Sequence, residues 1–188
     1  VMAVVKYLFF ISPYGNLFNF FNTIIAAPIM KFGATPGALI AVYTFACIMW
    51  FFGVHPSPII STYAVVLTSA STANIEAYAA GQALPYFGLM VMYLCVYFSG
   101  TGNTLGLSLC TLKAKSERYK SMKAITLIPN LFNINEPVVF GFPVMLNPIF
   151  FIPMILCTLI PGLLGWAVTS VFTFNFNPSI SLPWVTPT

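Results

Sequence analysis

The chain has 188 residues, of which 59% are hydrophobic and only 5% are charged. Soluble domains average about 25% charged residues, so this composition excludes a soluble fold and predicts a polytopic membrane protein. The formal net charge of +4 does not indicate a nucleic-acid partner, because most of the cations lie in one short segment, Lys113 to Lys123.

The predicted elements are apolar segments interrupted by proline and by small polar residues. Residues 17–30 are too few to span a bilayer, which takes about 20 residues, whereas residues 38–54 predict a transmembrane helix. Residues 59–81 have a small, polar middle and predict a hairpin-like element that does not cross the bilayer fully. Residues 84–112 are predicted to break or kink where Gly, Ser and Thr cluster, between Ser99 and Gly106.

The last long apolar stretch, residues 138–172, predicts one full span and a shorter segment, divided at Pro148, Pro153 and Pro161. The chain contains 15 prolines, so several broken helices are expected. Non-helical backbone at membrane depth is tolerated only where it is buried in protein or lines a cavity. Discontinuous helices around a central site are typical of secondary transporters.

Two titratable residues each precede a proline: His55, the sole histidine, and Glu136, one of three acidic residues. Proline disfavours helical geometry in the residue before it and is favoured at the first helical position. An ionisable group at membrane depth costs about 2.5–3.5 kcal/mol, so it is retained where it has partners, water or a substrate. The two breaks are therefore predicted to converge on one polar pocket. In the alternative interpretation, His55 only caps a helix and backbone N–H groups satisfy Glu136.

The basic segment, Lys113 to Lys123, is predicted to be cytoplasmic by the positive-inside rule. It contacts either lipid head groups or a cytosolic partner, and the sequence leaves both open.

The sequence contains no zinc-protease, phosphate-loop or Ser-His-Asp pattern. The four cysteines are scattered and are interpreted as small buried hydrophobes, so neither a metal nor a cofactor is expected. On spacing alone, Trp50 and Trp184 are expected to anchor helices at the membrane interface.

The segment from Asn133 to Pro148 resembles the signature of the sugar-translocating enzyme IIC subunit of the bacterial phosphotransferase system. The similarity is to the lactose, cellobiose and diacetylchitobiose branch. Two more segments resemble the same family: Trp50 to His55, and Gly100 to Gly106 ahead of the basic segment. The resemblance covers the whole chain but only half of a family member. It implies that residues 1–188 are the C-terminal substrate-binding and transport domain, without the N-terminal domain that mediates dimer contacts.

The resemblance implies an all-α integral membrane fold, polytopic, with broken helices and two re-entrant hairpins that hold the sugar. It carries the family's pocket residues over to Glu136 and His55. Asn135, Trp50 and Trp184 fall at pocket positions by the same match.

The implied function is the import of a β-linked disaccharide across the bacterial cell membrane, by rigid-body motion of this domain against the missing one. A phosphocysteine on the cytosolic enzyme IIB would phosphorylate the sugar's 6-hydroxyl, with phosphoenolpyruvate as the ultimate donor and a homodimeric permease as the membrane component. The chain is then not a stand-alone catalyst. Glu136 would either only bind that hydroxyl or also accept its proton, with His55 as the other polar contact.

Two alternatives belong to other functional classes. One is an ion-coupled transporter or channel that uses Glu136 as the cation or proton site. The other is a membrane scaffold or receptor that transports nothing.

Overall fold

The computed structural model describes residues 12–13, 31–173, 176–180, 183 and 185–187. Within these residues every regular element is a helix, in agreement with the predicted all-α class. The predicted short apolar segment at residues 17–30 and the pocket candidate Trp184 lie outside the described residues.

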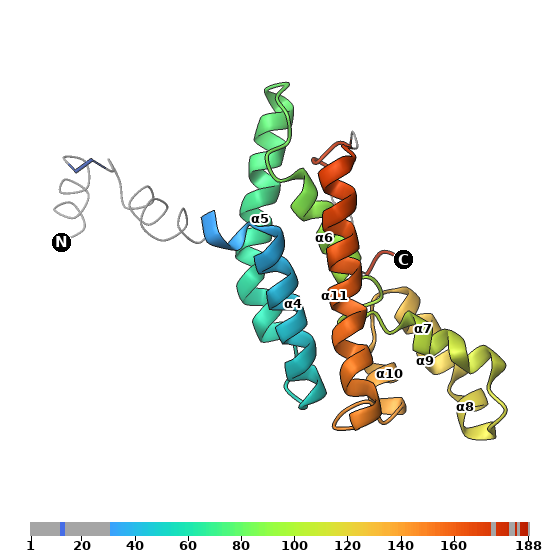
Figure 1. The fold of residues 1–188 in the computed structure, drawn as a ribbon. Coiled ribbons are helices and arrows are strands. Elements are labelled where there is room, and N and C mark those ends of the chain that lie inside the picture. Colours follow the sequence, from blue (N-terminus) through green and yellow to red (C-terminus); the bar gives the residue numbers. More distant parts are fainter. Residues whose placement is uncertain (1–11, 14–30, 174–175, 181–182, 184, 188) are drawn as a thin grey trace, which may run out of the picture.

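Four helices form a bundle. Helix α11 (Pro148–Val171) packs along α6 (Phe87–Val96) and α4 (Pro36–Phe51), and α5 (Ser57–Ala79) packs against α4 and α6 (Figure 1). One buried cluster joins α4, α5 and α6, and a second cluster around Trp50 joins the end of α4 to α10 and α11.

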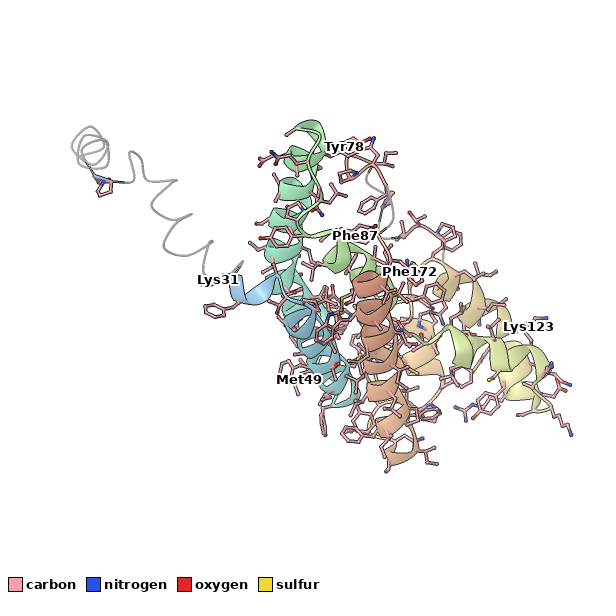
Figure 2. The ribbon with its side chains drawn as sticks, turned by 45° about the horizontal axis from the view of Figure 1, so that its top comes forward. Lys31, Met49, Tyr78, Phe87, Lys123 and Phe172 are labelled. Carbon is pink, nitrogen blue, oxygen red and sulfur yellow. The ribbon has the colours of Figure 1, made fainter. Side chains whose placement is uncertain are left out.

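A set of short helices projects from one side of the bundle, and we call it the arm (Figure 1). The arm consists of α7 (Leu105–Cys110), the 3-10 helix η2 (Thr111–Lys113), α8 (Glu117–Ser121) and α9 (Lys123–Leu131), and α10 (Glu136–Gly141) follows it. Helix α9 doubles back along α7. The basic segment therefore lies on the arm, where Figure 2 shows Lys123 far from Lys31.

Helix α11 is the one helix in the described part of the chain that is long and apolar enough to cross a membrane. Helices α4 and α6 are apolar but shorter. The outer face of α11 keeps aliphatic side chains such as Ile149 and Val171 exposed along its length. This apolar outer surface agrees with the membrane protein that the hydrophobic composition of the sequence predicts.

The prediction of a hairpin at residues 59–81 is wrong, because α5 is a single helix of 23 residues. Its buried side chains pack against α4 and α6. Hydroxyl groups along it bond to the carbonyl four residues earlier within the helix. These hydroxyl donors are Thr62, Ser69 and Thr72.

The prediction that Pro153 and Pro161 divide the last apolar stretch is also wrong, because α11 continues through both. Proline has no N–H, so Pro161 leaves the carbonyl of Cys157, four residues earlier, without its helical donor. The side-chain amide of Asn103 donates to that carbonyl at 2.6 Å. The same Nδ2 atom donates to the carbonyl of Cys95 at 3.2 Å, in the last turn of α6. Asn103 therefore bonds to α6 and α11 together.

Helix α11 approaches α4 and α6 closely at two glycines. A Cβ atom at Gly162 would lie 2.9 Å from Cγ1 of Ile40 and 3.0 Å from Cγ1 of Val96, and one at Gly165 would lie 3.1 Å from Sγ of Cys95. Small residues at such positions allow helices in membranes to pack backbone against backbone.

We expect Gly162→Ala to destabilise the fold by about 1–3 kcal/mol, because the added methyl group overpacks the junction of three helices. The thermal unfolding midpoint of purified protein in detergent measures this change. Gly37→Ala is the matched control, since Gly37 is also helical and a Cβ atom there meets nothing within 4 Å. Equal midpoints for the two variants would contradict the close approach.

We expect Asn103→Ala to cost about 1–3 kcal/mol, because it removes the side-chain donor from two carbonyl groups. In a Pro161→Ala background the cost should be smaller, since an alanine at that position can donate its own N–H to the carbonyl of Cys157. Thermal unfolding of the two single variants and the double variant measures this coupling. Independent, additive costs would show that Asn103 does not compensate for Pro161.

Candidate functional site

A cavity of about 310 Å³ lies where the start of α5, the end of α6 and the turns before α7 and α10 meet, and we call it the central cavity. Four of the five predicted pocket residues line it: Trp50, His55, Asn135 and Glu136. The predicted convergence of the two proline breaks is therefore confirmed.

His55 and Glu136 lie next to each other in the lining of this cavity. Nε2 of His55 lies 3.6 Å from Oε1 of Glu136, and their side chains are 50% and 43% exposed. Nδ1 of His55 accepts a hydrogen bond from the backbone N–H of Ser57 at 3.2 Å. A neutral imidazole that accepts at Nδ1 carries its proton on Nε2, so its N–H group is on the nitrogen nearest the carboxylate.

His55 therefore bonds to the first turn of α5 through Nδ1 and also lines the central cavity. The 3.6 Å separation from Glu136 exceeds hydrogen-bond distance. Each group thus keeps the capacity to bond to a ligand. Among the described residues, the contact of the Glu136 carboxylate is the one with His55, and none with a backbone N–H group is seen.

Trp50 lies behind His55 and is only 1% exposed. The two ring centroids are 4.4 Å apart, and the rings meet edge to face at 72°. Its indole Nε1 is buried and has no hydrogen-bond partner in the described structure. The expectation that Trp50 anchors a helix at the membrane interface is wrong, because the ring packs in the interior and supports the histidine.

Asn135 joins the turn before α10 to the turn before α7. It occupies the N-cap position of α10, but its Nδ2 atom donates to the backbone carbonyl of Thr101 at 2.6 Å. A Cβ atom at Gly100, where φ is 82°, would lie 2.9 Å from both the Asn133 carbonyl oxygen and Cγ of Asn135. The Gly/Ser/Thr segment is therefore a tight turn packed against the Asn/Glu segment.

Sequence reasoning missed several polar residues that also line the central cavity. Tyr93 and Tyr97 stack with ring centroids 5.8 Å apart and 10° between their planes. Ser57 and Ser61 line the cavity from α5. Both pairs have the four-residue spacing that places side chains on one helix face, which is a signal that the sequence contained. Thr101 lies in the Gly/Ser/Thr segment that predicted a break, but no pattern in the sequence distinguished it from its neighbours.

The cysteines lie apart from this site. All four are free thiols, and Cys47 is buried with its Sγ 2.9 Å from Oγ1 of Thr158. The interpretation of all four as buried hydrophobes is wrong for Cys110 and Cys157, which are exposed. No group of three or more His, Cys, Asp or Glu residues that could hold a metal occurs among the described residues.

Comparison with known proteins connects this arrangement to one family. The family profile described as "Phosphotransferase system, EIIC" matches residues 1–158. The galactose-specific EIIC component of a PTS system from Lactococcus lactis subsp. cremoris (strain MG1363) is 39% identical over 191 residues, which cover 100% of this chain and 42% of that protein. The lactose-specific EIICB component of a PTS system from Staphylococcus aureus is 33% identical over 143 residues, which cover 74% of this chain and 25% of that protein.

The fold also has a counterpart among solved structures. The crystal structure of the transporter ChbC, the IIC component from the N,N'-diacetylchitobiose-specific phosphotransferase system, superimposes with a TM-score of 0.86 at 24% identity. The match covers 98% of this chain and 43% of ChbC. The chain thus spans less than half the length of each of these three proteins. Because the profile covers most of the chain and both relatives exceed 30% identity, the chain belongs to the phosphotransferase system EIIC family.

Proposed function

We propose that residues 1–188 form the C-terminal, substrate-binding and transport domain of a bacterial sugar permease that crosses the cell membrane several times. The family membership, the apolar outer face of α11 and the short coverage of longer relatives support this. The turn that contains Thr101 and the turn that contains Asn135 both line the central cavity, and they are our candidates for the tips of the two re-entrant hairpins. Dimerisation would involve a domain outside this chain.

We propose that the substrate is a β-linked disaccharide of the cellobiose, diacetylchitobiose and lactose class. The names of two matched proteins, specific for lactose and for diacetylchitobiose, support this class, and the galactose-specific relative makes galactose the sugar to compare with it. The central cavity, at about 310 Å³, is within the range of small-molecule sites.

The adjacent pair of His55 and Glu136 is the observation that carries this function. A sugar hydroxyl is both a donor and an acceptor, so one hydroxyl can donate to the Glu136 carboxylate and accept from Nε2–H of His55. A hydrogen bond to a carboxylate is roughly twice as strong as one between neutral groups. Asn135 fixes the turn that carries Glu136, Trp50 supports the ring of His55, and Trp184 is proposed as a further pocket residue on family resemblance alone.

Phosphoryl transfer in this proposal uses an enzyme IIB component, because we assign no phosphorylated thiol to residues 1–188. In the proposed step, the phosphoryl group leaves the cysteine sulfur of enzyme IIB and forms a bond with the sugar's 6-oxygen. The hydroxyl proton then passes to Glu136, and the thiolate remains on the partner. The name "EIICB" of the lactose-specific relative supports a partner of this kind.

The competing function is ion-coupled transport with a cation at Glu136. The imidazole nitrogen 3.6 Å from the carboxylate disfavours a cation there, since its N–H is on the side of the carboxylate. The described residues also place no further carboxylate in the central cavity.

We expect Glu136→Gln to weaken disaccharide binding by about ten- to a hundredfold, because it replaces a charged hydrogen bond by a neutral one. Equilibrium binding of cellobiose, lactose, diacetylchitobiose and galactose to the purified full-length protein measures the loss, and phosphoenolpyruvate-dependent formation of sugar phosphate measures transfer. Glu76→Gln is the matched control, since Glu76 is exposed on α5 and does not line the cavity.

Normal binding and phosphorylation by Glu136→Gln would contradict the role of this residue. Sugar uptake that follows a Na⁺ or H⁺ gradient without sugar phosphate would favour the ion-coupled function instead.

A further inference from the structure

Helix α9 is reversed in polarity, with polar side chains inside and apolar ones outside. Thr126 and Asn130, four residues apart, are both 0% exposed. The large hydrophobic side chains exposed here are Ile125 and Ile128 on α9 and Phe132 directly after it. Burying an amide side chain is costly unless it is hydrogen-bonded, so the amide of Asn130 requires hydrogen-bond partners inside the protein.

The side chain of Asn130 makes three buried hydrogen bonds. Its Oδ1 atom accepts from the hydroxyl of Ser99 and from Oγ1 of Thr104, the latter at 3.2 Å. Its Nδ2 atom donates to Oγ of Ser108 at 2.6 Å. We call Asn130, Ser99, Thr104 and Ser108 the Asn130 network. All four members are buried, so no water replaces a lost bond at little cost.

The Asn130 network holds both ends of the turn that contains Thr101, a residue that lines the central cavity. Ser99 and Thr104 stand at the two ends of this turn, and both bond to Asn130. Three residues after Asn130, the backbone enters the second turn, which contains Asn135 and leads to Glu136. The two turns meet again at the bond from Asn135 to the Thr101 carbonyl.

Both turns contain non-glycine residues in the left-handed region, with φ of 60° at Ser99, 48° at Asn103 and 63° at Asn133. Such conformations persist only where the surrounding contacts determine them. The Asn130 network supplies those contacts at Ser99, on the side away from the cavity. The geometry of the cavity wall therefore depends on a residue that does not line the cavity.

We infer that Asn130 is a positioning residue for the sugar, which acts by setting the relative placement of Thr101, Asn135 and Glu136. This inference rests on the proposed sugar-binding function. It assigns Asn130 no contact with the substrate. A change in the network should therefore alter sugar affinity through the two turns, and not only the stability of the fold.

Two threonines allow a matched test, because Thr104 and Thr158 are both buried and each makes one hydroxyl hydrogen bond to another side chain. Thr104 belongs to the Asn130 network, whereas Thr158 bonds to Cys47 between α11 and α4 and lines no part of the central cavity. Thr→Val preserves side-chain shape at both positions. Asn130→Ala removes three buried bonds, so the milder Thr104→Val carries the test if Asn130→Ala does not fold.

We expect Thr104→Val to weaken disaccharide binding to the full-length protein by about three- to tenfold, whereas Thr158→Val binds within about twofold of the wild type. Thermal midpoints of the two variants control for stability. In combination with Asn135→Ala, Thr104→Val should add little further loss, because both changes act on the same turn.

Wild-type affinity in Thr104→Val, equal losses in the two threonine variants, or additive losses with Asn135→Ala would overturn the positioning role. If the wild type binds sugar and Glu136→Gln does not, these outcomes leave the proposed function intact. A wild-type protein that binds none of the four sugars overturns both proposals.

Discussion

Side-chain amides that bond to backbone groups hold the central part of this fold together. A membrane interior offers no water to satisfy the backbone where a helix is broken, so protein groups have to do it. The side-chain amide of Asn103 donates to the carbonyls of Cys95 and Cys157, and that of Asn135 donates to the carbonyl of Thr101. At the other end of the bundle, Oδ1 of Asn74 accepts from the N–H of Tyr86 at the start of α6. Asparagine is thus the residue that makes irregular backbone possible here.

The same constraint shapes the candidate site. Breaks in the helices leave short turns near the middle of the molecule, and each turn carries a polar side chain into the central cavity. His55 belongs to the turn before α5, and Glu136 to the turn that begins α10. Because their neighbours satisfy the backbone, neither side chain is fully used within the protein, and both remain available to a polar ligand.

The site could be predicted from the sequence to the extent that its chemistry is local. A titratable residue before a proline is visible in the sequence, and the turns at His55 and Glu136 follow from it. The helix class and the break near Gly100 also follow from composition and from small residues.

The errors arose where long-range contacts decide the structure. Pro161 predicts a break, and the helix continues because Asn103, 54 positions from the carbonyl that it serves, replaces the missing donor. The polar middle of α5 predicts a turn, and the helix continues because Tyr63, Val66 and Ala70 pack in the buried cluster with α4 and α6. Trp50 resembles an interface anchor, but packing in the same buried cluster as Val138 and Val139 of α10 makes it an interior residue. No local pattern reports a partner so far along the chain.

The two hydrogen bonds made by the side chain of Asn103 have a mechanical consequence. One side chain thereby links the turn beside the cavity to both α6 and α11. Gly162 in turn allows α11 to pack closely against α4. A hinge between these elements would have to break both of these hydrogen bonds. We therefore expect α4, α6, α11 and the turn beside the cavity to move as one rigid body. The distances between these parts of the cavity wall would stay constant during such a motion.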